Sequence, residues 1–486
     1  MTVSIALFTQ DLRLHDNPVL HAARAAADQV VPLFVLDPAV EGAGFAAPNR
    51  LAFLSDCLAD LDASLRRAGS RLVVRRGEPA EQTAKVATEA GAGTVHVAAG
   101  VSAFAHRREE GLREVFGNRL HVHDASLTVV PAGRITPAGR DHYAVFTPYH
   151  RAWRQAPHRG VLAAPRVIRT PDGIGSENLV FRGPLSPSLP HGGERAGREL
   201  RRRWDVDAYA DVHDDLAADA TSRLSPYLHF GCLSATELTA GALQRGGPGA
   251  EAFVRQLAWR DFHHQVLAAR PDAAHRDYRA RDDHWHHDER EAEAWRQGRT
   301  GYPIIDAGMR QLAEEGWMHN RARLLTASFL TKSLYLDWRI GAAHFLSLLV
   351  DGDIAVNQLN WQWVAGTGTD TRPNRVLNPL RQADRYDPRG DYVRRWVPEL
   401  AHLPGPSIHR PWLLDGDYPP PIIAPEDLTA RFQHGRPVLG AGERQDRPTG
   451  PPVHPVAGSG SKAGSWSRRS GHRPESTPLT SDEEPR

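Results

Sequence analysis

The chain has 486 residues, of which 41% are hydrophobic and 24% are charged, and its formal net charge is +1. This length exceeds a single typical core, so two or three domains are expected. The near-zero charge excludes a global attraction for nucleic acid, so any such binding requires a local basic patch. The two cysteines, Cys57 and Cys232, exclude a disulfide framework and a cysteine-rich zinc or iron–sulfur site.

The first residues, Met1–Phe8, are apolar, but they carry no basic leader and Asp11 and Arg13 follow at once. This pattern predicts a first β-strand and not a signal peptide. No apolar run approaches the roughly 20 residues that a membrane-spanning helix needs. We therefore expect a cytoplasmic protein without a membrane partner.

Residues 1–130 alternate short apolar runs with alanine-rich helical patterns. Strands are predicted over 3–8, 30–36, 71–75 and 94–98, and helices near 18–28, 48–68 and 79–91. This alternation predicts a Rossmann-like α/β domain with a parallel sheet. The glycine-rich dinucleotide fingerprint does not follow the first strand, which argues against a nicotinamide dehydrogenase.

The rest of the chain divides by composition. Residues 131–203 are rich in Pro, Gly and Arg and are predicted to be an interdomain linker. Helical periodicity dominates 204–434, which predicts an all-α domain. Residues 435–486 have almost no large apolar side chains and are predicted to be a disordered tail.

The segment from Asp351 to Trp363 carries the most informative chemistry. It contains Asp351, Asp353, Asn357 and the indoles of Trp361 and Trp363, directly after an apolar run. Acids and an amide can hold a polar heterocycle by hydrogen bonds, whereas indoles can stack on it or pass electrons to it. A helix end with a tryptophan-rich core patch is the alternative.

A second segment places recognition groups on one helical face. Phe253, Gln256, Trp259, Arg260 and His263 recur at spacings of three and four. An amide, an indole and a guanidinium on one stripe suit a flat, polar, anionic ligand such as a nucleotide. An exposed face with one half-buried tryptophan is the alternative.

Further polar groups lie near predicted helix ends. Asn320, Arg323 and Leu324 share one side of a helical segment, and Thr221–Ser225 precedes Pro226. Hydroxyls and amides at a helix start can cradle phosphate, although such residues are also common helix caps.

Histidines 284, 286 and 287 surround Trp285 without the spacing of a metal site. They are predicted to be solvated surface, and no metal site is predicted. The nucleophile elbow of hydrolases and the Walker phosphate loop are absent from the sequence.

Together the motifs resemble the DNA photolyase/cryptochrome family, over about residues 3–434, and are most like class I cyclobutane pyrimidine dimer photolyases. The matching stretches are 11–18, 221–225, 259–262, 301–306, 316–321, 351–353, 361–363 and 390–400. The resemblance implies an N-terminal antenna-binding domain and a helical domain that holds one FAD in a folded, U-shaped form.

The resemblance also implies a set of FAD-binding residues. Tyr209 and residues 221–225 would hold the phosphates and ribityl chain, Arg323 would pair with Asp351 beside the isoalloxazine, and Asn357 would face flavin N5. The full set is Tyr209, Thr221, Ser222, Arg223, Leu224, Ser225, Phe253, Arg323, Asp351, Gly352, Asp353 and Asn357.

Two further sets follow by position. The cavity for a flipped pyrimidine dimer would be lined by Gln256, Trp259, Asn320, Leu324 and Trp363. The DNA-binding set also includes His263 and four residues at the rim of this cavity, which are Arg260, Arg321, Arg375 and Gln382. The catalytic set comprises Asn357, Gln256 and the electron-transfer tryptophans Trp285, Trp338 and Trp361.

The implied reaction is that of a light-driven carbon–carbon lyase. Blue light excites reduced FAD, an electron passes to the cyclobutane dimer in damaged DNA, and the ring opens. The implied antenna is 8-hydroxy-5-deazaflavin, with methenyltetrahydrofolate as the alternative, held with the help of Arg50 and Glu109. The protein is expected to act as a monomer.

Some residues depart from the family pattern and favour other functions. Gln256 stands where many dimer photolyases carry Glu, Leu324 replaces a common Met, and His213 replaces an Arg. Gln256 and the predicted tail favour a cryptochrome-like photoreceptor that signals without repair, whereas Asn320, Trp259, Trp363 and Asn357 favour repair. A (6-4) photolyase is less favoured, because His319 is followed by Asn320 and not by a second active-site histidine.

Overall fold

The structure is a computed structural model that describes residues 1–43, 45–177, 183–414 and 416–436. The predicted disordered tail, 435–486, lies outside the described residues except for Gly435 and Arg436. Gly435 ends the last helix and Arg436 follows it as the cap residue. The disorder of residues 437–486 therefore stays a prediction.

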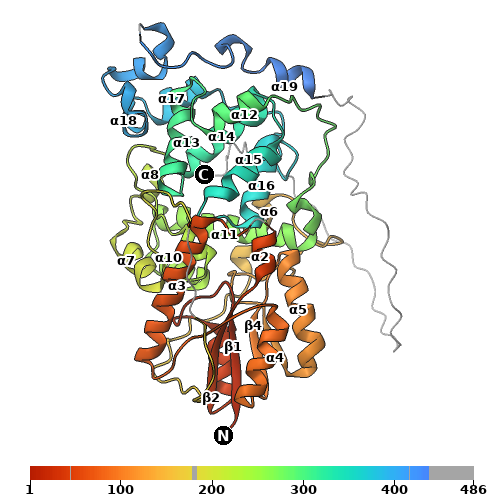
Figure 1. The fold of residues 1–486 in the computed structure, drawn as a ribbon. Helices are drawn as coiled ribbons and strands as arrows, with labels where there is room; N and C mark the ends of the chain where they lie inside the picture. The colour runs from red at the N-terminus through yellow and green to blue at the C-terminus, as the bar shows by residue number, and fades with distance from the viewer. Residues whose placement is uncertain (44, 178–182, 415, 437–486) are drawn as a thin grey trace. The chain divides into compact units, whose positions relative to one another are not determined.

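The N-terminal part contains one five-stranded parallel sheet with the order β3-β2-β1-β4-β5 (Figure 1). Its strands are β1 (Val3–Phe8), β2 (Gln29–Leu36), β3 (Val73–Arg76), β4 (Thr94–Ala98) and β5 (Leu120–His123). Helices cover both faces of such a sheet, so its inner strands are continuous apolar runs. The prediction of a parallel α/β sheet is confirmed.

Helices flank this sheet on both faces, among them α3, α4 and α5 (Figure 1). They are α1 (Pro18–Ala26), α2 (Pro38–Gly42), α3 (Pro48–Arg67), α4 (Pro79–Ala90) and α5 (Ala103–Phe116). Proline stands at the start of the first four, where its missing N–H costs no hydrogen bond. Asn17 caps α1, because its side chain accepts a hydrogen bond from Leu20 N at 2.9 Å.

The predicted linker contains two helices, α6 (Phe146–Gln155) and α7 (Glu194–Arg203). Trp153 of α6 is fully buried, and its Nε1 donates to Asp261 of the helical part at 2.9 Å. The segment is therefore packed against the helical part and does more than connect two domains.

The helical part contains no β-strand among the described residues from 204 to 436, only an isolated bridge between His286 and Leu336. Its helices are α8 (Tyr209–Val212), α9 (Ser225–His229), α10 (Ala235–Arg245), α11 (Pro248–Ala269), α12 (Glu289–Arg296), α13 (Pro303–Glu315), α14 (Asn320–Ser328), α15 (Trp338–Leu348), α16 (Ile354–Ala365), α17 (Pro379–Tyr386), α18 (Asp391–Trp396) and α19 (Ala430–Gly435). One π-helical turn, Phe329–Ser333, continues α14. This confirms the all-α prediction.

Short 3-10 turns complete the described secondary structure. They are Gly117–Arg119, Pro271–Ala274, Pro398–Leu400, Gly405–His409, Pro411–Leu413 and Pro425–Asp427. A search of the described helices found none with both the length and the apolar character needed to cross a bilayer.

Two arginines connect the α/β part with the helical part. Arg13 is 1% exposed and donates to Gly231 O at 2.9 Å and to Ser126 O at 3.0 Å. Arg50 of α3 donates to Leu349 O at 2.8 Å, to Leu346 O and to Phe45 O. Gly231 has a φ of +68° and no room for a Cβ beside Gln10, so only glycine suits this contact.

Candidate flavin and DNA site

The acidic segment lies between α15 and α16, where Asp353 caps α16 by accepting a hydrogen bond from Val356 N at 2.9 Å. Gly352 lies in the tight turn before it. A Cβ at Gly352 would lie 2.7 Å from Arg50 Nη1, so the glycine lets the guanidinium approach the turn. Arg50 therefore helps fix the position of both aspartates.

Asp351 forms a two-pronged ion pair with Arg323 of α14, with N–O distances of 2.8 and 3.2 Å. The Asp351 side chain is 3% exposed, and Arg323 Nε also donates to Met318 O at 2.8 Å. This is the pairing that the family resemblance implies. Such fork-like geometry orients both groups.

Asp353 pairs with His264 of α11 at 3.1 Å. Burial alone would raise the pKa of this carboxyl, but the charge and hydrogen bond of His264, with Arg260 and His229, hold its pKa well below the ordinary value. Burial lowers the pKa of the neighbouring His263 to about 3, and His263 is only 2% exposed. The site therefore places the anionic carboxylate of Asp353 on His264, next in sequence to His263, whose imidazole is neutral at pH 7.

Asn357 is 8% exposed on α16, and its Nδ2 donates to Ala342 O at 3.2 Å and to Gln358 Oε1 at 2.9 Å. These bonds use both N–H donors of the amide, so the side chain has a fixed orientation.

The three predicted electron-transfer tryptophans differ in environment. Trp361 is 2% exposed and packs so tightly on Gly341 that a Cβ there would overlap its ring. Trp338, at the start of α15, is fully buried and donates to Asp277 Oδ1 at 2.8 Å. Trp285 is half-buried, with its ring 4.9 Å from that of Tyr335. Exposure thus rises from Trp361 to Trp285.

Trp295, which the sequence analysis did not select, lies close to this set. Its ring centroid is 6.0 Å from that of Trp361 at 75°, and its Nε1 donates to Thr326 O at 3.0 Å. From the sequence, a tryptophan in the helix Glu289–Arg296 is predicted only to pack in the hydrophobic core.

Trp259 of α11 stacks on Phe146 of α6, with ring centroids 3.6 Å apart and planes within 6°. The contact covers one face of the indole. The Trp259 side chain is half-buried, and its Nε1 has no hydrogen-bond partner among the residues of the described chain. The indole Nε1 can therefore offer a hydrogen bond to a ligand.

In the segment Thr221–Ser225, Arg223 has a positive φ of +49°. Its guanidinium pairs with Asp219 at 2.6 Å and Glu315 at 3.2 Å, and it covers the Trp317 ring at 4.3 Å. Non-glycine residues in this strained region occur mainly where the surroundings fix them, often at ligand sites. Asp219 and Glu315 already neutralise the charge of the Arg223 guanidinium. Any contribution of Arg223 to phosphate binding would therefore come from its backbone N–H.

Several buried polar atoms near these groups lack partners. Among the described residues, no hydrogen bond reaches Thr221 Oγ1, His263 Nδ1, His319 Nε2 or Trp259 Nε1. Buried polar atoms are nearly always satisfied, so orphans on one set of elements fit a polar ligand such as FAD.

Two residues of the predicted DNA-facing rim have mostly covered side chains. Arg321 has a side chain only 5% exposed and binds both oxygens of Asp214 at 2.8 Å. Arg260 is 13% exposed and donates to Leu127 O at 2.6 Å. Packing against distant chain segments covers both, which helical spacing cannot reveal; contact with DNA stays a prediction.

The remaining predicted residues differ in exposure. Asn320 and Ser225 are exposed, whereas Tyr209, Phe253, Leu324 and Leu224 are buried. Half-buried positions are Ser222, Gln256, Trp363, Arg375 and Gln382. Of the two antenna residues, Glu109 accepts from Gly100 N at 2.9 Å, and Arg50 holds the carbonyls described above.

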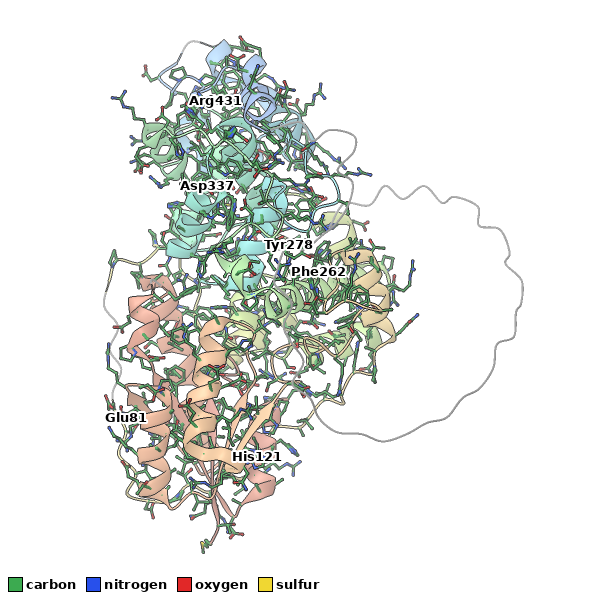
Figure 2. The ribbon with its side chains drawn as sticks, turned by 90° about the vertical axis from the view of Figure 1, so that its right-hand side faces the viewer. Glu81, His121, Phe262, Tyr278, Asp337 and Arg431 are labelled. Atoms are coloured by element: carbon green, nitrogen blue, oxygen red, sulfur yellow. The ribbon has the colours of Figure 1, made fainter. Side chains whose placement is uncertain are left out.

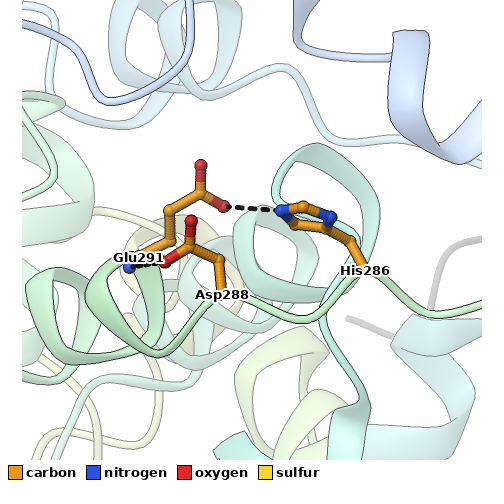
Figure 3. Close-up of side chains that lie close together, drawn as sticks. All are labelled: His286, Asp288 and Glu291. Atoms are coloured by element: carbon orange, nitrogen blue, oxygen red, sulfur yellow. Dashed lines mark hydrogen bonds and ion pairs between the residues drawn. The ribbon is translucent and has the colours of Figure 1, made fainter.

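The histidines around Trp285 are not all solvated surface. His284 and His287 are exposed, but His286 is half-buried and lies 3.7 Å from Glu291 (Figure 3). His286, Asp288 and Glu291 place possible ligand atoms within 4.8 Å of one another. However, Arg431 binds both oxygens of Glu291 at 2.6 and 2.8 Å, and Asp288 caps α12.

Comparison with known proteins agrees with this geometry. Residues 4–167 match the family model for DNA photolyase, and residues 253–434 match that for the FAD binding domain of DNA photolyase. The deoxyribodipyrimidine photo-lyase of Streptomyces griseus is 61% identical over 452 residues, covering 90% of this chain and 99% of that protein.

Two solved structures are similar as well. The class III photolyase of Agrobacterium tumefaciens has a TM-score of 0.82 at 30% identity, covering 89% of this chain and 97% of that one. The cryptochrome of Synechocystis sp. PCC6803 also has a TM-score of 0.82 at 30% identity, covering 89% and 98%. The chain therefore belongs to the DNA photolyase family.

Proposed function

We propose that the chain is a deoxyribodipyrimidine photo-lyase, a light-driven carbon–carbon lyase that splits cyclobutane pyrimidine dimers in damaged DNA. The observation that carries this proposal is 61% identity to the Streptomyces griseus deoxyribodipyrimidine photo-lyase across nearly the whole of both chains. The Arg323–Asp351 pair and the unpartnered buried polar atoms of several predicted site residues support the same function.

FAD in its reduced form would supply the excited electron donor, and the protein would supply binding, orientation and electrostatics. Arg323 and Asp351 would hold the ring edge, and the Thr221 hydroxyl would donate to a phosphate or ribityl oxygen. Asn357 would present its amide to flavin N5, because its own hydrogen bonds to Ala342 and Gln358 fix its orientation.

The flipped pyrimidine dimer would enter a cavity lined by Gln256, Trp259, Asn320, Leu324 and Trp363. Photolyases extrude their target from the duplex, and a damaged base is cheaper to unstack. Stacking on an aromatic side chain contributes roughly 1–3 kcal/mol per base, so Trp259 would be a main contributor. Arg260, His263, Arg321, Arg375 and Gln382 complete the proposed DNA-binding set.

Trp361, Trp338 and Trp285 would carry electrons from the surface toward oxidised flavin. Trp285 is half-buried, whereas Trp361 and Trp338 are 2% and 0% exposed. This difference supports Trp285 as the terminal donor, because that donor must exchange electrons with the solvent. Replacing Trp361 with Phe should slow photoreduction of oxidised flavin and leave repair by already reduced enzyme intact.

The antenna would be 8-hydroxy-5-deazaflavin, with methenyltetrahydrofolate as the alternative. Arg50 and Glu109 would contribute to its site. Arg50 would do so through the N–H groups that do not already donate to backbone carbonyls. We expect the protein to act as a cytoplasmic monomer.

A cryptochrome-like photoreceptor is the second candidate. Gln256 favours it, because an amide cannot release a proton to the dimer as a carboxylic acid can. Similarity to the Synechocystis cryptochrome at the same TM-score shows that the fold serves proteins of both names.

The deciding experiment uses purified full-length protein, a reductant and an oligonucleotide containing one thymine dimer, under blue light and in the dark. Light-dependent recovery of intact thymines supports the lyase. An unchanged lesion together with normal flavin photoreduction supports the photoreceptor.

A further inference from the structure

Three histidines gather at the outer edge of the N-terminal sheet, where Figure 2 labels His121. His96 lies on β4, and His121 and His123 lie on β5, the edge strand, with His96 opposite His121 and Ala98 opposite His123. Side chains alternate along a strand, so Val95, Val97 and Leu120 point into one core while the three imidazoles share the opposite face.

The imidazoles are in close contact. His96 Nδ1 and His123 Nε2 are 3.1 Å apart, and the His96 ring stacks on the His121 and His123 rings with centroids 4.8 and 5.4 Å apart. His96 Nε2 lies 3.3 Å from Thr94 Oγ1. A hydrogen bond from that nitrogen to Thr94 would leave Nδ1 of His96 as a lone-pair donor facing His123.

Burial, together with this contact, favours the uncharged form of His96 and His123. Burial, with the neighbouring His123 and His121, lowers the pKa of His96 to about 4, and burial and His121 lower the pKa of His123. Protonating all three would place like charges side by side. Neutral imidazole is the form that binds metal ions.

We propose that His96, His121 and His123 form a binding site for a divalent transition-metal ion such as Zn²⁺. Zinc binds histidine nitrogen at about 2.0–2.1 Å in a tetrahedron, which places two ligand nitrogens roughly 3.3 Å apart. The His96–His123 nitrogen distance of 3.1 Å is close to that spacing.

The other parts of a zinc site are also present. His121 is exposed, so its side chain can rotate to become the third ligand, and water can take the fourth position. Thr94 would orient His96 from behind, as outer groups commonly do for metal-binding histidines. The proton between His96 and His123 would move to Nδ1 of neutral His123, so its Nε2 could bind the ion.

The chain contains an internal comparison, because three other side chains already bring possible ligand atoms within 4.8 Å of one another. They are His286, Asp288 and Glu291, whereas the sheet-edge trio converges in this way only when His121 turns toward His96 and His123. At the His286 cluster, a metal ion would have to displace Arg431 from Glu291 and a helix cap from Asp288. At the sheet edge it would displace only one bond between two rings. The sheet-edge trio should therefore bind first.

The test is titration of tag-free, full-length protein with ZnCl₂ alone, followed by calorimetry and equilibrium dialysis. The expected result is one Zn²⁺ per chain in the native protein and at least a tenfold weaker affinity in the double variant H121A/H123A. The matched control is H286A, which removes a histidine from the other cluster and should bind as the native chain does.

Cobalt(II) substitution adds a second readout, because a histidine-bound tetrahedral ion gives visible absorption that the double variant should lose. Unchanged flavin binding and circular dichroism would show that the double variant is folded. No Zn²⁺ binding by the native chain, equal affinity in H121A/H123A, or loss of binding in H286A would overturn the proposal. None of these results depends on DNA repair.

Discussion

The helical site and the sheet edge arrange their polar side chains in opposite ways. At the helical site, buried groups meet opposite charges, as in Arg323–Asp351, Asp353–His264 and Arg321–Asp214. At the sheet edge, three like imidazoles face one another. The first arrangement fixes directions for hydrogen bonds to a heterocycle. The second places nitrogen lone pairs side by side, where a hydrogen-bond donor, a proton or a metal ion can bind them.

The largest expected effect tests charge pairing at the helical site. Arg323→Ala leaves the buried Asp351 carboxylate unpaired, which should destabilise the fold by roughly 3–5 kcal/mol. FAD retention should fall in parallel, as measured by denaturant unfolding and flavin absorbance.

Arg410→Ala is the matched control, because Arg410 pairs with Asp384 at 2.7 Å on the surface, with side chains 30% and 45% exposed. Its cost should be about 0–1 kcal/mol. Equal losses in the two variants would contradict a special role for the buried pair.

A second prediction concerns His263, whose folded-state pKa lies below the ordinary value. Its folded form excludes a proton that the unfolded chain accepts, so its contribution is complete above pH 6.5 and falls as pH drops toward about 3. Unfolding free energy should therefore decline across that window by a few kcal/mol, on the order set by such a shift.

His263→Phe should flatten this decline, and the exposed His284→Ala should not change it. The measurement is chemical denaturation at several pH values. A slope unaffected by His263→Phe would show that other groups control acid sensitivity at the helical site.

A third prediction tests how tightly Trp361 is held. Gly341→Ala places a methyl group against the Trp361 ring, and overpacking of this kind costs about 1–3 kcal/mol. Flavin photoreduction should slow as the ring shifts, as followed by transient absorption.

Gly241→Ala on α10 is the control, because no atom lies within 4 Å of its added methyl group. Replacing glycine in a helix should stabilise it by up to about 1 kcal/mol. A neutral Gly341→Ala would mean that the ring has room to move.

The smallest expected effect concerns lesion binding. Trp259→Ala should weaken affinity for a dimer-containing oligonucleotide by the roughly 1–3 kcal/mol of one stacking contact. Arg381→Ala, at an exposed position beside Gln382, should cost less. Equal losses in fluorescence anisotropy titrations would argue against stacking as the main contact.

The sheet could be predicted from the sequence almost completely. Four strands contain apolar residues in runs or in alternation, and their predicted bounds agree with the structure within about two residues. The fifth strand was missed, because His121 and His123 interrupt its short apolar pattern. Those same residues form the sheet-edge trio, so the missed strand and the unexpected cluster have one cause.

The site could be predicted only in part. Arg323 and Asp351 are 28 residues apart, and family resemblance, not periodicity, suggested their pairing. Helical spacing predicted the face of Arg260, and family resemblance suggested Arg321, but neither could show that these side chains bind Leu127 and Asp214. His264 escaped notice because nothing in its neighbourhood signals a partner 89 residues away.

Arg50 has one more consequence for light capture. Its guanidinium clasps carbonyls of Phe45, Leu346 and Leu349, so the α/β part is bound directly to the end of α15. Transfer of excitation between two pigments depends on the separation and mutual angle of their transition dipoles. A pigment held by the α/β part would therefore keep a fixed distance and orientation relative to one held by the helices, and no hinge would have to close.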